Sequence, residues 1–184
     1  MKTLKTLVFF MAVCTISYSS QAQSLTDKAS QRALVCAESM LNALHSSNWT
    51  GYMAMTYPGM VKYYGGIEGF REYMRRSGSE NTGNQPAHDK MEIIQIDNQN
   101  NEWQCVIRRS RETNVDGQKA VIISYMVGQS TDEANTWKYV DVAFNSSENL
   151  VYIMPDVFAS LSIPLRQVIY EKDINNFEMA TVTK

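Results

Sequence analysis

Apolar residues spaced three and four positions apart mark the first predicted helix, from Thr26 to Ser46. This spacing places them on one face of a helix that packs on a core. The residues of this face are Ala29, Ala33, Cys36, Ala37, Met40, Leu41 and Leu44. Two shorter helices are expected next. One runs from about Trp49 to Met55 and ends before Pro58-Gly59, and the other runs from Ile67 to Arg76 after Gly65-Gly66.

Strand-like sequence follows a stretch of loop composition from Ser77 to Pro86, which we expect to be the most mobile interior part. Four runs then have the composition and alternation of strands. They are His88–Asp97, Glu102–Thr113, Gln118–Gln129 and Asn135–Asn145. The short, turn-rich links between them predict antiparallel neighbours. Apolar residues on both faces predict a curved sheet with helices on one face and partial cover, or a partner, on the other.

The pattern changes again after the fourth run. Ser146-Ser147 suits the start of a short helix that contains Leu150, Val151 and Ile153. One more turn is expected over Asp156–Leu161, and an edge strand near Gln167–Tyr170. We therefore predict an α+β domain in which N-terminal helices pack on a curved antiparallel sheet. A helical C-terminal extension over residues 146–184 would complete it.

The first 22 residues have the pattern of a secretory signal peptide. Lys2 and Lys5 precede an apolar run from Leu7 to Ile16, and the small residues after it predict cleavage after Ala22. The run is shorter than the roughly 20 apolar residues that span a bilayer. We therefore expect a secreted or periplasmic protein.

A lipoprotein anchored through Cys14 is the disfavoured alternative, because Val13 stands where lipoprotein signals usually carry a small residue. The mature part, residues 23–184, is long enough for one domain with its own core. We place the core of this domain at about residues 25–145. No second apolar segment is long enough to be a transmembrane span.

Charge and histidine content narrow the function classes. The mature chain keeps 15 basic and 19 acidic residues, a net charge of −4. Its basic residues form only pairs, such as Arg75-Arg76 and Arg108-Arg109, which argues against a nucleic-acid partner. His45 and His88 lie far apart, and no clustered ligand motif or phosphate-binding glycine loop is present. We expect no metal and no cofactor.

Cys36 and Cys105 both lie in the predicted mature chain. In an oxidising compartment such a pair is a disulfide candidate. The alternative is that each is a small buried hydrophobic residue, as free cysteines often are. The sequence leaves both interpretations open, because a disulfide requires Cα atoms within roughly 7 Å.

The segment YPGMVKYYGGIEGFREYM from Tyr57 to Met74, followed by strands that include TWKYVDV, resembles the NTF2-like superfamily. This cystatin-like α+β cone includes SnoaL-like and ketosteroid-isomerase-like domains, and the resemblance covers about residues 25–145. It implies a strongly curved sheet around a long helix, with a pocket at the open end. The later NLVYIMPDVFASLSIP is similar to extensions of secreted bacterial members without assigned activity.

Members of this superfamily include isomerases, dehydratases and cyclases, and many others only bind a ligand or a protein. Many form dimers through the sheet. Isomerase-like members use a tyrosine and a protonated acid as oxyanion donors and another acid as the base. By this resemblance Asp141 is the candidate base, with Tyr57 or Tyr64 as donors. The favoured alternative for Asp141 is a structural ion pair with Arg108 or Arg109, or a simply exposed carboxylate.

Several residues are candidates for contact with a ligand in the pocket, because aromatic and guanidinium groups combine apolar surface with hydrogen bonding. They are Tyr57, Tyr64, Trp103, Arg108, Trp137 and Tyr139. Our first hypothesis is an exported domain that binds a small ligand or a protein without catalysis. The alternatives are an isomerase or lyase that uses Asp141, and a dimeric structural component.

Overall fold

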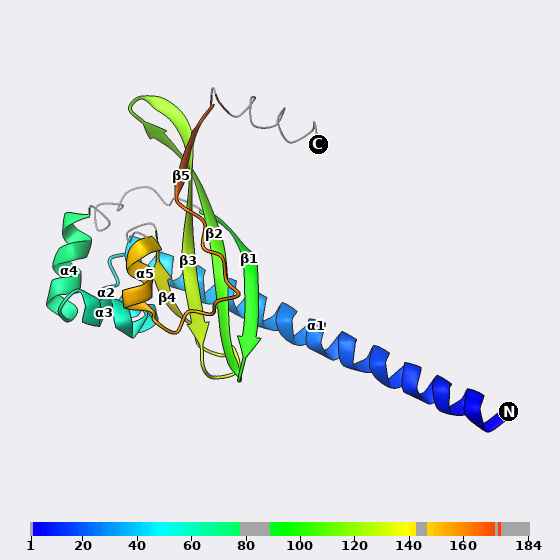
Figure 1. The fold of residues 1–184 in the computed structure, drawn as a ribbon. Coiled ribbons are helices and arrows are strands. Elements are labelled where there is room, and N and C mark those ends of the chain that lie inside the picture. Colours follow the sequence, from blue (N-terminus) through cyan, green and yellow to red (C-terminus); the bar gives the residue numbers. More distant parts are fainter. Residues whose placement is uncertain (1, 78–88, 143–146, 172, 174–184) are drawn as a thin grey trace.

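The computed structural model describes residues 2–77, 89–142, 147–171 and 173, and within them the chain has an α+β fold (Figure 1). The helices are α1 (Lys2–His45), α2 (Trp49–Met55), α3 (Pro58–Tyr63), α4 (Ile67–Arg76) and α5 (Ser147–Ile153). The strands are β1 (Lys90–Gln99), β2 (Glu102–Val115), β3 (Gln118–Ser130), β4 (Lys138–Asp141) and β5 (Gln167–Tyr170). They form one antiparallel five-stranded sheet, so the predicted class is confirmed at this level.

The sheet has the order β1-β2-β3-β4, and β5 also pairs with β3. β4 pairs with Met126–Gln129 and β5 with Ala120–Ile123, so both lie on the same edge of β3. On the other side of the hairpin, β1 pairs with β2 only from Glu102 to Ser110. β2 and β3 continue beyond this point to a tight turn at Asp116-Gly117 (Figure 1). We call residues 111–122 of this projecting hairpin the arm.

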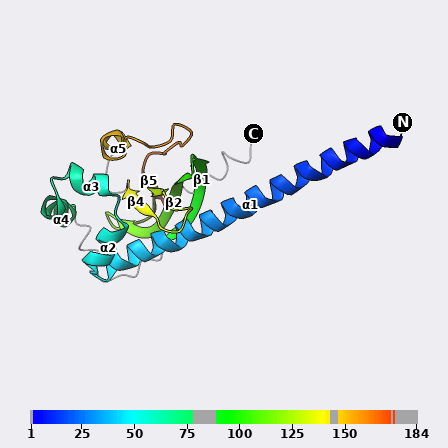
Figure 2. The same ribbon diagram turned by 90° about the horizontal axis from the view of Figure 1, so that it is seen from below.

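α1 lies along one face of the sheet, the inner face, and α5 lies on the opposite, outer face (Figure 2). The apolar side of α1 from Ala29 to Leu44 is buried, as its spacing predicted. It packs in one core with inner-face residues such as Cys105, Ile107 and Tyr139. The sheet is therefore the middle layer, and its two faces have different neighbours.

Two helix boundaries differ from those expected. α1 begins at Lys2 rather than near Thr26, because no proline or glycine interrupts residues 2–45. Pro58 opens α3 instead of acting as a break, because its fixed φ angle and missing N–H suit the first turn of a helix. α2 and α4 have the predicted boundaries, and the side chain of Asn48 caps α2 by accepting from the Gly51 N–H at 3.0 Å.

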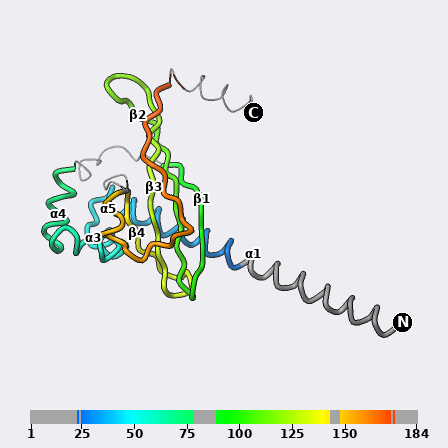
Figure 3. Tube along the Cα trace, viewed as in Figure 1, coloured from blue at the N-terminus to red at the C-terminus, as the bar shows by residue number. Residues whose placement is uncertain are grey.

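After α5, the described residues up to Tyr170 are mostly extended, so a helical C-terminal extension is not confirmed beyond α5 itself. Residues 154–166, here named the strap, cross the outer face and return to β5 beside the arm (Figure 3). Pro155 and Pro164 each lack the N–H that a continuing helix needs, so only isolated turns form over 156–161. β5 spans Gln167–Tyr170, as predicted.

The fourth predicted strand is shorter than expected, since β4 covers only Lys138–Asp141. Ahead of it, the Asp132 carboxylate accepts from the Thr136 N–H at 2.8 Å and from the Ser130 hydroxyl at 2.8 Å, which closes a turn. His88, residues 143–146 and most of the predicted 77–86 loop lie outside the described residues.

Candidate functional site

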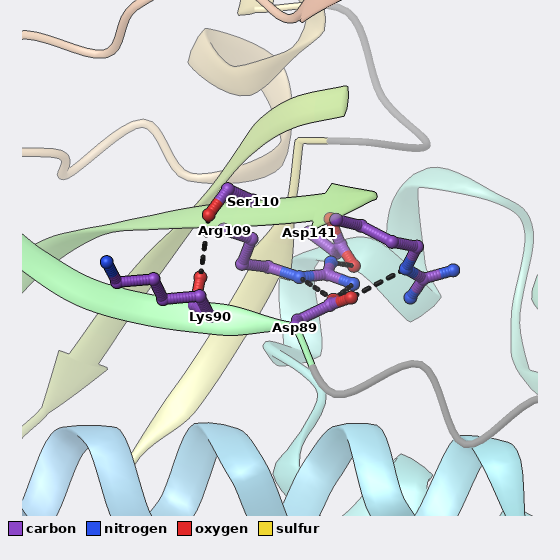
Figure 4. Close-up of polar contacts among 6 residues, drawn as sticks. Asp89, Lys90, Arg109, Ser110 and Asp141 are labelled. Carbon is purple, nitrogen blue, oxygen red and sulfur yellow. Dashed lines mark hydrogen bonds and ion pairs between the residues drawn. The ribbon is translucent and has the colours of Figure 1, made fainter. Parts of the chain in front are cut away.

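A buried cluster of charges lies on the inner face near the end of β4 (Figure 4). Asp141 accepts from Arg109 Nη1 at 2.5 Å through Oδ2, and its side chain is 2% exposed. The Nε and Nη2 atoms of Arg109 both donate to Asp89 Oδ2, at 2.9 and 2.5 Å. Arg111 Nε donates to the other oxygen of Asp89 at 2.6 Å. Two guanidinium groups thus balance two carboxylates.

The cluster favours the charged forms of Asp89 and Arg109. Burial alone would raise the pKa of Asp89, but hydrogen bonds and charge from Arg111 and Arg109 bring it below its usual value. Burial alone would likewise lower the pKa of Arg109, and Asp141 and Asp89 more than offset this effect. Burial and the Asp141 charge raise the pKa of the neighbouring Tyr52 hydroxyl, which therefore stays protonated.

His45, at the end of α1, lies beside this cluster. Its partial burial and the nearby positive charges of Arg111 and Arg109 lower its pKa, against an opposing effect of Asp89. The imidazole is therefore favoured in its neutral form next to groups that are already paired. The carboxylates and guanidinium groups beside His45 pair with one another, so His45 need not carry a proton to balance their charge.

The structural interpretation of Asp141 is confirmed, and Arg109 rather than Arg108 is its partner. Arg108 lies on the other face of β2 and pairs with Glu92 at 2.7 Å, with both side chains about half exposed. A general base needs a free oxygen lone pair directed at its substrate. The short contact of Asp141 Oδ2 with a buried guanidinium argues against that role.

The two tyrosines considered as oxyanion donors have other partners. The Tyr57 hydroxyl donates to Asp156 Oδ1 at 3.1 Å, and burial followed by the charge of Asp156 raises its pKa to about 12. Tyr64 stacks on Tyr73 with ring centroids 4.0 Å apart. Burial and a hydrogen bond with Tyr73 raise the pKa of Tyr64. The structure thus places Tyr57 with the strap and Tyr64 with α4.

The remaining residues of the predicted ligand set do not gather at one place. Trp137 and Tyr139 are 1% and 0% exposed, so they are core residues rather than pocket-lining ones. Trp137 Nε1 donates to the Ala134 carbonyl at 3.1 Å, and the Tyr139 hydroxyl donates to the Ala33 carbonyl of α1 at 2.6 Å. Trp103 is half-buried against the same core. The hydrogen bond of Tyr139 joins β4 to α1.

Cys36 and Cys105 are free thiols in this structure, which corresponds to the second of the two alternatives. Cys105 is fully buried, and burial raises its pKa to about 12. The absence of a side chain at Gly128 makes room here, because a Cβ atom would lie 2.7 Å from the Tyr139 ring and 2.9 Å from Cys105 Sγ. Cys105 is therefore a packing residue and a poor nucleophile.

The sequence did not predict a second cluster of polar side chains, which lies on the outer face of the sheet. Gln104 is fully buried, donates through Nε2 to Glu102 and to the Asp156 carbonyl at 2.6 and 3.0 Å, and accepts from the Phe158 N–H at 2.8 Å. Gln129 donates to Glu102 at 2.6 Å and to Asp156 Oδ2 at 2.9 Å. These side chains fix the strap to β2 and β3. The alternation of β2 places Gln104 on the outer face, but nothing in the sequence shows that the strap returns there.

The contact between the strap and the sheet continues across β1. The Ser160 hydroxyl donates to Asp97 Oδ2 at 2.6 Å, and the Ser162 N–H donates to Gln95 Oε1 at 2.7 Å. Hydrogen bonds to Asp97 from Ser160 and Gln99 lower the pKa of that carboxyl. Side chains of the sheet thus satisfy the backbone and hydroxyl groups of a segment that has no strand partner at this point.

The arm carries a groove of about 600 Å³, which the sequence analysis also missed. Its lining residues come from the end of β2, the start of β3 and the position after β5. They are Glu112, Thr113, Asn114, Lys119, Ala120, Val121 and Glu171. None of the six predicted ligand residues is among them. Lys119 Nζ lies 3.8 Å from Glu171 Oε1, and both side chains are largely exposed.

The described residues contain no group of three histidine, cysteine, aspartate or glutamate side chains arranged to hold a metal ion. Within the same part of the chain, no helix has the length and apolar character needed to cross a membrane. No protein-family model, curated protein or solved structure matches this chain.

Proposed function

We propose that this chain is an exported binding domain of NTF2-like type that takes a small ligand or a protein partner without catalysis. The observation that carries this proposal is the groove on the arm. Its volume of about 600 Å³ lies within the range of ligand sites, roughly 300–1,000 Å³. Its lining combines two carboxylates, an ammonium group and short polar side chains with the apolar Ala120 and Val121.

The arrangement of the titratable groups supports binding over acid–base chemistry. Asp141 and Asp89 are committed to Arg109 and Arg111, and Tyr57 is committed to Asp156. The isomerase or lyase alternative stated for this chain would need Asp141 directed at a substrate. The signal-peptide pattern of residues 1–22 and the long helix against an antiparallel sheet support the exported and NTF2-like parts of the proposal.

The test is native mass spectrometry of the mature protein, residues 23–184, purified under mild conditions from the organism that encodes it. We expect a bound small molecule or a second, different chain. An Asn114→Trp variant fills the groove and should reduce the occupancy at least about tenfold. The matched control is Gln118→Trp, an exposed position of the same arm that does not line the groove. A bare wild-type mass, or equal occupancy in both variants, would contradict the proposal.

The dimeric structural role is a separate alternative, and the same spectra address it. A homodimer mass with no other component, unchanged by Asn114→Trp, would favour that role over ligand binding.

A further inference from the structure

The two edges of the arm differ in what covers them. On the β3 side, β5 pairs with Ala120–Ile123. On the β2 side, β1 pairing ends at Ser110, and among the described residues Arg111–Val115 pairs with β3 alone. An uncovered strand edge presents backbone N–H and C=O groups that another strand can use. Within the described part of the chain, the arm therefore offers an open edge next to its groove.

The register of the hairpin determines which backbone groups point outward. Val115 and Gln118 flank the two-residue turn at Asp116-Gly117, and such flanking residues bond to each other. Alternate residues of an antiparallel strand bond to alternate sides. Thr113 is therefore directed at β3, whereas the N–H and C=O groups of Glu112 and Asn114 are directed at the open edge.

The groove lies beside the same two residues, since Glu112 and Asn114 both line it. Lys119, the cation of the lining, is paired with Glu171 at 3.8 Å. Glu112 is exposed and, within the described part of the chain, belongs to no ion pair. The groove thus has an excess of negative charge next to the open edge, which complements a basic side chain.

We propose that the partner is an extended peptide with a basic residue, which adds as a strand to β2 along Arg111–Val115. This inference rests on the proposed binding function and specifies the partner. Backbone hydrogen bonds to Glu112 and Asn114 hold the peptide, and every second side chain projects over the groove. A lysine or arginine at such a position reaches the carboxylate of Glu112. Affinity comes from the edge and selectivity from the groove.

Amide hydrogen exchange tests the open edge in the mature protein without any ligand. We expect the Glu112 and Asn114 amides to exchange at least about tenfold faster than those of Arg111 and Thr113, whose N–H groups bond to β3. Comparable protection at all four amides would mean that another segment already covers this edge. That result would overturn the inference.

Peptide pools test the partner. One pool of peptides about nine residues long, enough to extend past the edge, has a central lysine and randomised neighbours, and a second pool has a central glutamate. On immobilised wild-type protein we expect the lysine pool to be enriched about tenfold over the glutamate pool. Equal retention of the two pools, or no retention, would overturn the inference.

Two variants at one position separate the backbone from the side chain. Asn114→Pro removes the Asn114 side chain together with an outward N–H, a change that an edge strand tolerates, and it should abolish the enrichment. Asn114→Ala loses the same side chain but keeps the N–H, so it should retain most of the enrichment. Retention by Asn114→Pro equal to that of Asn114→Ala would show that the edge is not used.

Further outcomes distinguish a failure of strand addition from a failure of the proposed binding function of the groove. A native ligand that is lost from Asn114→Trp but kept by Asn114→Pro would preserve the groove function and refute strand addition. A homodimer in light scattering that Asn114→Pro dissociates would identify a second copy as the occupant of the edge and refute the peptide. A ligand indifferent to both variants would refute the groove function itself.

Discussion

The two faces of the sheet both bury polar groups, but with different chemistry. The inner face uses ions, with Arg109 between Asp89 and Asp141 beneath the helices. The outer face uses neutral amides, with Gln104 and Gln129 bonded to the strap. Arg109 and Gln104 both come from β2, whose odd residues point inward and whose even residues point outward.

This difference indicates how the interactions on each face stabilise the fold. Buried ions are costly to leave unpaired, so Arg109 and its two carboxylates stabilise the fold only as a complete set. An amide that loses its partner costs less, and the strap has several such contacts in series. The inner layer is therefore predicted to fail as a unit, whereas the outer layer is predicted to loosen locally.

The largest expected effect is at Arg109. Arg109→Met leaves two buried carboxylates without their shared cation and should lower the free energy of unfolding by about 3–5 kcal/mol. Arg108→Met is the matched control on the same strand, where loss of the exposed pair with Glu92 should cost about 0–1 kcal/mol. Urea unfolding of the two variants measures the difference. Similar midpoints for both would show that the inner cluster is not buried in solution.

An intermediate effect is expected at Gln104. Gln104→Leu leaves the Phe158 N–H and the Asp156 carbonyl without their partner and should cost about 1–3 kcal/mol. Amide exchange at Phe158 should accelerate more than exchange in α1, because the strap loosens first. Asn98→Leu, at an exposed position of the same sheet, is the control and should change stability by within about 0.5 kcal/mol. Equal acceleration in α1 and at Phe158 would contradict the local character of the outer layer.

Much of the fold was predictable from local rules. The break at Gly65-Gly66 predicted the start of α4, and the strand-like run at Gln167–Tyr170 predicted β5. Strand alternation and the short links between strands also predicted that Asp141 lies near Arg108 or Arg109. Only the structure decides between the two arginines, because that choice depends on the register of β3 with β4.

The candidate site was less predictable, because it depends on where distant segments meet. Trp137 and Tyr139 looked suitable for a pocket, but the position of α1 makes them core residues. Asp89 joins the inner cluster through tertiary pairing that its sequence neighbours do not indicate. The groove lies on the part of β2 and β3 that extends beyond the end of β1. Composition does not encode this difference in strand length.

A smaller effect is expected at Tyr57, which adds one hydrogen bond to the outer layer. Tyr57→Phe should cost about 0.5–1.5 kcal/mol. The pKa of Tyr57 is raised from 10.0 to about 12, so the unfolded chain loses this proton first and stability falls as pH rises between these values. The variant should show a shallower decline there. Tyr152→Phe is the control, because that side chain is 74% exposed; identical alkaline slopes in all three proteins would exclude the bond to Asp156.

The smallest expected effect concerns His45, which borders the inner cluster. Its folded pKa is below the ordinary 6.5, so the unfolded state binds the proton first as pH falls. The stabilising contribution is complete above pH 6.5 and is lost as pH falls from there through the folded pKa. His45→Gln should make the loss of stability below pH 6.5 shallower, by a small amount because the imidazole is only partly buried and solvent screens its neighbours. A steeper decline in the variant would mean that Asp89 and the carbonyl end of α1 prevail over Arg111 and Arg109, which would reverse the charge balance inferred for the inner face.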